Sequence, residues 1–344
     1  MSSHHELLEQ WQRWGETIKS EGWSQRTVSR VYGVSERRGR TLAEWAQHGV
    51  PEKYKAYIRQ KSGAPNERIV EEYIATHQKD RSRIAPLNIR KPGPSILVIP
   101  DAHAMPNEDL RRFTWLGRAV RELDIDAVVC IGDWADMEAL NKFDKPGSRA
   151  FEGRRYTADL AAGNEALRLF HREIDGQWEG HLVFCEGNHE HRISRAVDSA
   201  VTILDDVISL DDLDFAKRGW SVYPFLTPFI CEGVAFSHYF ASGVMCRAVG
   251  GVNMARNLIL KTLGSAVVGH SHILDYSRQA RQDGSGRHFS GLSVGCYFEA
   301  DHGWAGPANR MYWRGLCVLR DVNDGDYDLE TWSMERIKAR FGDE

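Results

Sequence analysis

Short apolar runs bounded by turn-forming residues are the main pattern of the chain after residue 94. The run 96–99 lies between Pro94 and Pro100 and consists of branched apolar residues, which predicts a strand buried on both faces. Similar runs predict strands at 127–131, 181–185, 234–237, 266–268, 315–319 and 327–332. Because the first runs are continuously apolar rather than alternating, they favour central strands of an α/β fold.

The front of the chain has a helical pattern instead. Apolar residues recur at spacings of three and four over 7–18, which predicts one amphipathic helix that stops near Gly22. Ser24 is a candidate N-cap for a helix over 25–32, and Ser35 is a candidate N-cap for a second helix over 36–47. The two helices are joined by a short turn that contains glycine.

A change of composition separates this helical part from the rest. Segments 51–62 and 66–80 predict further helices, and the run 79–94, rich in charged residues, proline and glycine, has the composition of a linker. We therefore predict a boundary near residue 90. It divides the chain into a small all-α module, 1–90, and a larger α/β domain, 91–344.

Polar residues of metal-ligating types follow five of the predicted strands. In chain order they are Asp101-x-His103, Gly132-Asp133, Gly187-Asn188-His189-Glu190, His238, and Gly269-His270-x-His272. Any one group alone is more often structural, but the ordered set favours a functional site. Ligands of open α/β sheets bind beyond the carboxyl ends of the strands, so these groups should converge. The glycines allow sharp turns and a close approach of the backbone to an ion.

This ordered set resembles that of the calcineurin-like metallophosphoesterases, over about 94–319. The resemblance implies a four-layer α/β/β/α sandwich and a site for two metal ions. It implies that one ion is held by Asp101, His103 and His272, that the other is held by Asn188, His238 and His270, and that Asp133 bridges them. Mixed oxygen and nitrogen ligands suit manganese, iron, zinc or nickel better than magnesium or calcium, and we place manganese first.

The same resemblance makes His189 the catalytic histidine, a general acid that protonates the leaving alkoxide. In the phosphoprotein phosphatases of this family, an aspartate three positions after the bridging one orients the histidine, and Asp136 keeps that spacing. The next two positions, an arginine and a glycine in that subfamily, are Met137 and Glu138 here. The missing arginine is a phosphate clamp, and its loss counts against a protein phosphatase of that type.

Composition limits the class of protein. With 344 residues, 42% hydrophobic and 27% charged, the chain is ordinary for a soluble globular protein. No apolar run approaches the roughly 18 residues of a membrane span, and the start lacks a signal-peptide pattern, so we expect a cytoplasmic protein with no membrane partner. The six cysteines include no C-x-x-C pair, which favours reduced thiols over disulfides or zinc knuckles.

The charge is unevenly distributed. Residues 1–95 hold 17 Lys and Arg against 11 Asp and Glu, a net of +6 that leaves −10 for the remainder. A basic front module favours an anionic partner. The helix pair resembles helix-turn-helix segments of DNA-binding proteins, and its second helix begins with Arg37, Arg38 and Arg40. Such a module also docks onto proteins or completes a core, and both alternatives stay open.

A polar segment between the second and third motifs adds further positive charge. It runs from 141 to 156 and is long for a connection between a strand and a helix. It contains Lys142, Lys145, Arg149, Arg154 and Arg155. Arg154 and Arg155 are candidates for binding a phosphate-rich substrate, although a plain surface insertion fits the pattern equally well.

The favoured function is a dinuclear-metal-dependent phosphodiesterase or nuclease that acts on nucleic acid, DNA or RNA, or on nucleotides. Attack of a metal-bridged hydroxide would be assisted by His189. A phosphomonoesterase, for example on phosphoproteins, is the first alternative. The second is a DNA-binding or adaptor protein whose phosphoesterase domain is only a scaffold, and the intact set of metal-ligand positions argues against it. No pattern indicates an oligomeric state.

Overall fold

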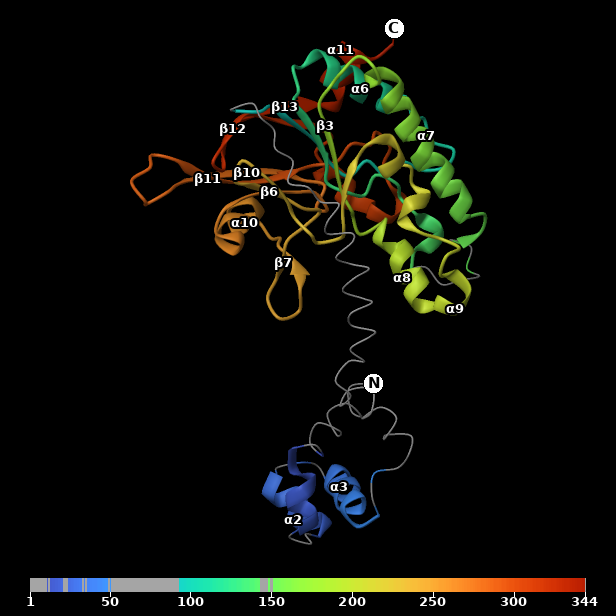
Figure 1. The fold of residues 1–344 in the computed structure, drawn as a ribbon, viewed down its shortest axis with the longest axis vertical. Helices are drawn as coiled ribbons and strands as arrows, with labels where there is room; N and C mark the ends of the chain where they lie inside the picture. Colours follow the sequence, from blue (N-terminus) through green and yellow to red (C-terminus); the bar gives the residue numbers. More distant parts are fainter. Residues whose placement is uncertain are drawn as a thin grey trace. The chain divides into compact units, whose positions relative to one another are not determined.

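The computed structural model describes residues 11, 13–20, 24–32, 34, 36–48, 50, 93–142, 148 and 151–343 (Figure 1). The chain divides into two compact units, Met1–Arg83 and Ile84–Glu344. The predicted helices at 51–62 and 66–80, the N-cap Ser35 and the boundary near residue 90 lie outside the described residues. No helix within these residues is long and apolar enough to cross a membrane.

The first unit is helical in its described part. Residues 13–20 are helical, followed by α2 (Gln25–Tyr32) and α3 (Glu36–His48), which confirms the two helices predicted there. The Oγ of Ser24 accepts a hydrogen bond from the backbone N–H of Thr27 at 3.3 Å, as an N-cap residue does. A small apolar core joins the helices through Ile18, Val28, Leu42, Ala43 and Trp45.

The second unit contains a six-stranded sheet. Its order is β13 (Asp326–Ser333), β12 (Gly315–Asn323), β1 (Ile96–Ile99), β2 (Ala127–Cys130), β3 (His181–Cys185) and β4 (Ser221–Tyr223). Strands β1 to β4 run parallel to one another. β12 runs antiparallel to β1, and β13 runs antiparallel to β12. All residues of β1 and β2 are buried, as their continuous apolar sequences predict.

A second sheet has five strands. Its order is β10 (Leu274–Ala280), β11 (His288–Val294), β9 (Ser265–Val268), β6 (Val234–Phe236) and β5 (Phe229–Cys231). The three inner strands run parallel to one another, and each edge strand runs antiparallel to its neighbour. A short hairpin, β7 (Ala241–Ser242) and β8 (Arg247–Ala248), follows β6.

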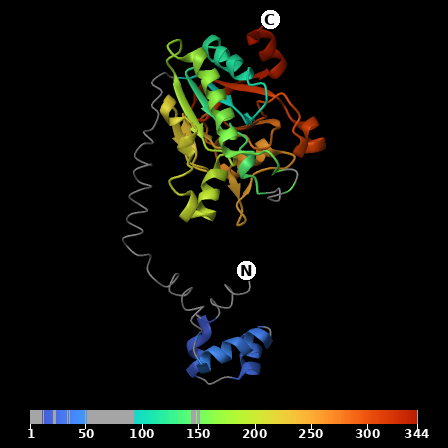
Figure 2. The same ribbon diagram turned by 90° about the vertical axis from the view of Figure 1, so that its right-hand side faces the viewer.

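The two sheets pack face to face through apolar side chains. Because successive residues of a strand point to opposite faces, Ile96 and Val98 of β1 contact the second sheet, and Leu97 and Ile99 contact helices. The helices on that outer face are α6 (Arg112–Glu122), α7 (Tyr156–Ile174) and α11 (Met334–Phe341) (Figures 1 and 2). Helix α10 (Met254–Thr262) packs on the second sheet. The predicted α/β class is therefore confirmed for this unit.

The remaining elements are short helices in the connections. They are η1 (Glu138–Leu140), α8 (His191–Ser199), α9 (Val201–Leu204), η3 (Leu210–Asp212), η4 (Ala216–Arg218) and η5 (Gly303–Met311). Of these, α8 begins directly after the third polar motif, so its first turns lie next to the residues described below.

Candidate metal centre

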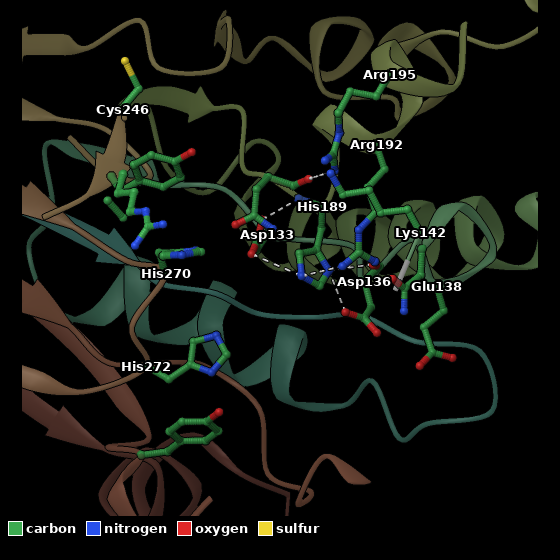
Figure 3. A pocket seen from close by; sticks show the side chains of 16 residues that line it. Asp133, Asp136, Glu138, Lys142, His189, Arg192, Arg195, Cys246, His270 and His272 are labelled. Atoms are coloured by element: carbon green, nitrogen blue, oxygen red, sulfur yellow. Dashed lines mark hydrogen bonds and ion pairs between the residues drawn. The ribbon is translucent and has the colours of Figure 1, made fainter. Parts of the chain in front are cut away.

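The polar residues that follow β1, β2, β3, β6 and β9 meet at one place, and Figure 3 shows Asp133, His189, His270 and His272 there. His103 and His272 are 169 residues apart in sequence, yet their Nε2 atoms lie 3.3 Å apart. His238 Nε2 lies 2.9 Å from Asn188 Oδ1. Asp133 Oδ2 lies 3.9 Å from His103 Nε2 and 3.4 Å from His238 Nε2. The predicted ligands thus form two groups with Asp133 between them.

The first group consists of Asp101, His103 and His272, and its three possible ligand atoms lie within 4.8 Å of one another. Asp101 Oδ2 is 2.9 Å from His272 Nε2, but this buried oxygen makes no hydrogen bond. A buried carboxylate oxygen without a donor is unfavourable unless a cation compensates it. The convergence of this oxygen and two imidazole nitrogens therefore fits a divalent metal ion.

The second group consists of Asp133, His238 and His270, with the amide oxygen of Asn188 beside it. His238 Nδ1 donates a hydrogen bond to the carbonyl of Ile131 at 3.0 Å. This bond places the ring proton on Nδ1 and leaves the lone pair of Nε2 directed at the group, 3.2 Å from His270 Nδ1. A histidine that binds a metal is commonly oriented in this way by a backbone carbonyl.

Asp136 contacts two of the histidines. Its Oδ1 accepts a hydrogen bond from His103 Nδ1 at 2.7 Å. His189 Nδ1 donates to the main-chain carbonyl of Asp136 at 2.6 Å and lies 2.7 Å from the same Oδ1. Burial would raise the pKa of Asp136, but the hydrogen bonds from the two imidazoles hold it well below its usual range. Asp136 therefore stays ionised and orients both rings. The sequence spacing predicted this contact for His189 and did not indicate it for His103.

His189 lies at the edge of the second group. Its backbone N–H donates to Asp133 Oδ1 at 2.9 Å, and its Nε2 lies 3.7 Å from Asp133 Oδ2. Burial opposes the imidazolium, yet the charges of Asp133 and Asp136 outweigh it and raise the pKa of His189 to about 9. Arg192, with Nη2 2.9 Å from His189 Nε2, acts in the opposite direction. The ring is thus held in place by carboxylates and faces a guanidinium.

Glu190 ties the loop after β3 to the loop after β2. Its buried carboxylate accepts hydrogen bonds from the backbone N–H groups of Asp133, Ala135 and Gly187 at 2.9, 3.0 and 3.1 Å. Gly187 allows this contact, because a Cβ there would lie 2.2 Å from the backbone nitrogen of Asp133. The motif included Glu190, but its role in holding Asp133 was not predicted.

Arg112 holds the loop that carries Asp101 and His103, and no pattern in the sequence indicated this role. It is the first residue of α6, and its side chain is 1% exposed. Its guanidinium donates to the carbonyl of Ala102 at 2.9 Å and to that of Tyr297 at 3.0 Å. Two segments of the centre are thus joined through one buried side chain.

A cavity of about 630 Å³ opens beside these groups. Its lining includes Asp133, His189 and His270, and it carries four basic side chains: Lys142, Arg192, Arg195 and Arg247. Neither Arg154 nor Arg155 is among its lining residues. Arg154 instead forms an ion pair with Glu138 at 3.4 Å. The positive charge expected from the segment 141–156 therefore reaches the cavity through Lys142 in the described part of that segment.

No family model and no curated protein matches the chain. Two solved structures are similar to it at 13% sequence identity, and each match covers 71% of this chain. One is a conserved uncharacterized protein from Streptococcus pneumoniae, described as a predicted phosphoesterase, with 91% of that chain covered and a TM-score of 0.30. The other is a dimetal phosphatase from Danio rerio, with 97% covered and a TM-score of 0.35. Similarity at this level is too low to indicate activity or substrate, so function is inferred from the side chains.

The arginines predicted to contact nucleic acid lie on α3 in the first unit. Arg37, Arg38 and Arg40 follow its first residue, Arg40 is exposed and Arg38 is half-buried. The side chain of Arg37 is outside the described residues.

Proposed function

We propose that the chain is a dinuclear-metal-dependent phosphoesterase with the four-layer arrangement of the calcineurin-like enzymes. One observation carries this proposal: two groups of ligand atoms, mostly buried, share the carboxylate of Asp133. A carboxylate between two clusters of histidine and oxygen donors is the arrangement that holds a pair of metal ions in phosphatases and nucleases. The ligands would be Asp101, His103, Asp133 and His272 for one ion, and Asp133, Asn188, His238 and His270 for the other.

The donor set limits the metal. Four imidazoles together with carboxylate and amide oxygens favour manganese, iron, zinc or nickel over magnesium and calcium, and manganese remains our first choice. Two such cations would supply Lewis-acid activation of water and neutralise charge on the phosphoryl oxygens. The buried Oδ2 of Asp101, which has no hydrogen-bond donor, and the facing Nε2 atoms of His103 and His272 support this fit.

His189 and Asp136 supply the proton chemistry. His189 bears a proton on Nδ1, which the carbonyl oxygen of Asp136 accepts at 2.6 Å with Asp136 Oδ1 at 2.7 Å, and this contact leaves Nε2 facing the cavity. A proton on Nε2 can pass to the oxygen of a departing alcohol, which would otherwise leave as an unstable alkoxide. Asp136 keeps the ring in this orientation throughout, because it remains ionised.

The favoured substrate is a phosphodiester of a nucleic acid or a nucleotide. Its support is the set of basic side chains around the cavity, together with the arginines on α3. A phosphomonoester is the second candidate, and the contact between Asp136 and His189 favours it, because the sequence spacing resembles that of phosphoprotein phosphatases. The intact set of metal-ligand donors argues against a purely scaffolding role.

The test uses chelator-treated protein reloaded with manganese, iron, zinc or nickel. We expect two metal ions per chain by mass spectrometry and metal-dependent hydrolysis of bis(p-nitrophenyl) phosphate in preference to p-nitrophenyl phosphate. A preference for the monoester would select the second candidate. If no metal restores hydrolysis of either ester while two ions are bound, the proposed activity is wrong.

A further inference from the structure

Two arginines on α8 project into the cavity from the same helix face. Arg192 and Arg195 are three residues apart, which places them next to each other on a helix surface. Figure 3 shows both on the same side of the cavity as His189. Arg192 is 8% exposed, and its Nη2 lies 2.9 Å from His189 Nε2. Arg195 Nη2 donates to the carbonyl of Asn188 at 3.3 Å.

Neither guanidinium has a counterion within the described part of the chain. Arg192 donates to the backbone carbonyls of Asp136 and Met137 at 2.7 and 3.2 Å, and neither it nor Arg195 pairs with a carboxylate. The Nε of Arg195 is buried and has no hydrogen-bond partner. Arginines elsewhere in this unit do form carboxylate pairs, among them Arg154, Arg168, Arg278 and Arg320. The carboxylates of Asp133 and Asp136 act on Arg192 electrostatically without contacting it. A buried donor and two guanidinium groups without a carboxylate at ion-pair distance, at the wall of a cavity, indicate a site for an anion.

The two arginines are anchored at different points. Arg192 is held beside His189 and Asp136, whereas Arg195 is held at the backbone of Asn188. Their guanidinium groups therefore have separate fixed positions. A cavity of about 630 Å³ is also larger than one phosphate group requires and falls in the range of nucleotide-sized ligands.

We propose that Arg192 and Arg195 form a two-phosphate subsite, which deepens the proposed function and rests on it. Arg192 leaves His189 and binds a non-bridging oxygen of the phosphate that is hydrolysed. Arg195 binds a second phosphate of the same substrate. The substrate class is then a phosphate ester with a neighbouring phosphate, as in a nucleic acid strand or a nucleoside bisphosphate. Arg192 would also supply, from α8, the phosphate contact that phosphoprotein phosphatases make with an arginine at the position of Met137.

The test compares two chromogenic esters that differ by one phosphate. They are the 5′-(p-nitrophenyl phosphate) of thymidine and the same ester with a 3′-phosphate, assayed with the metal-loaded protein. We expect the wild-type chain to prefer the second by about tenfold or more in kcat/KM. Arg195→Met should lower kcat/KM for the second ester by about 10- to 100-fold more than for the first, which is the range of a charged hydrogen bond. Arg195→Lys should recover part of the loss.

The other variants separate the roles. Arg192→Met should lower kcat for both esters by the same factor, because it contacts the phosphate common to both. Arg168→Met removes an exposed guanidinium of α7 that pairs with Glu165, and it should change neither ester. A third ester carries a second thymidine on its 3′-phosphate, so that this phosphate is also a diester. If the wild-type chain still prefers this ester over the one without a 3′-phosphate, the subsite binds a nucleic acid strand. If the preference disappears, the subsite binds a terminal phosphate.

A binding measurement is independent of turnover. Calorimetry should show that thymidine 3′,5′-bisphosphate binds more tightly than thymidine 5′-monophosphate, and that Arg195→Met removes the difference, with circular dichroism confirming that the variant is folded. Equal losses on both esters, or no bisphosphate preference in the wild-type chain, would overturn the subsite while leaving a metal-dependent phosphoesterase in place. Failure to hydrolyse any ester would instead overturn the proposed function.

Discussion

Replacement of Arg112 by methionine tests how the first metal group is held. The guanidinium of Arg112 donates to the carbonyls of Ala102, Asp109 and Tyr297 at 2.9, 2.9 and 3.0 Å, and to Glu108 Oε2 at 3.0 Å. Methionine keeps most of the apolar stem of arginine, so the packing around α6 is nearly preserved. All of the donors are removed.

The loss of stability follows from these contacts. Removing one partner of a buried ion pair costs about 3–5 kcal/mol, and each buried acceptor left without a donor costs about 1–3 kcal/mol. These contributions are not additive, and water can reach Glu108, which is 14% exposed. We therefore expect the free energy of unfolding to fall by about 3–4 kcal/mol. Because Ala102 lies between Asp101 and His103, metal affinity should also fall, by about 10- to 100-fold.

The assay combines urea denaturation of the metal-free chain with metal titration in the presence of a competing chelator. Arg111→Met is the matched control, since Arg111 is the neighbouring arginine, is 68% exposed, and pairs with Asp109 at the surface. The control should leave the free energy of unfolding nearly unchanged, because an exposed ion pair contributes little to stability. If Arg112→Met behaves like the control in both measurements, the conclusion that Arg112 holds the metal-binding loop is wrong.

Four further outcomes are expected. Asp133→Asn should abolish turnover and reduce bound metal, because one shared charge is removed; two ions and full activity would contradict this. His189→Ala should lower turnover by about 10²–10⁴ with metal content intact, and less for nitrophenolate than for alkoxide leaving groups. A thiol reagent should modify one cysteine, Cys246, in the native chain and six after unfolding, because the other five are buried and burial raises the pKa of Cys185 and Cys231 to about 12. Neutral substitutions at Arg37, Arg38 and Arg40 of α3 should weaken DNA binding. They should lower the slope of log affinity against log salt concentration by about 0.9 for each phosphate that is no longer neutralised, and leave hydrolysis of a small diester unchanged.

Several of the strands predicted from sequence are buried on both faces, although the partly exposed edge strand β13 was predicted as well. β1, β2 and residues 266–268 of β9 are continuous apolar runs because each of these strands lies inside a sheet covered on both sides. β10 was not predicted, since it is an edge strand whose sequence, Leu274–Ala280, is mostly polar and whose residues are half-buried or exposed. Its pairing with β11 depends on a neighbour that lies later in the chain.

The metal-ligand positions could be predicted for a related reason. Each ligand directly follows a strand, so the residue type and the strand pattern stand next to each other in the sequence. The supporting residues could not be found in this way. Arg112 contacts Tyr297, which is 185 residues away, and Arg192 contacts a loop 56 residues earlier. An arginine in a helix has no local feature that distinguishes such a role from surface exposure.

Several of the predicted metal ligands have a strained backbone conformation that glycine would adopt more easily. Four of the seven predicted ligands have left-handed backbone angles, with φ of 45°, 52°, 64° and 60° at His103, Asp133, His270 and His272. Such a conformation costs non-glycine residues about 1–3 kcal/mol each, and it persists only where neighbouring contacts enforce it. Here the ligand loops enforce one another: the carbonyl of Asp133 accepts the N–H groups of Ala102 and His103, both at 2.9 Å, and Asp101 Oδ1 accepts that of His270 at 3.0 Å. A glycine at these positions would relieve the strain but would carry no ligand. The strain is therefore a consequence of the chemistry, and cations bound by these side chains would offset it and stabilise the fold.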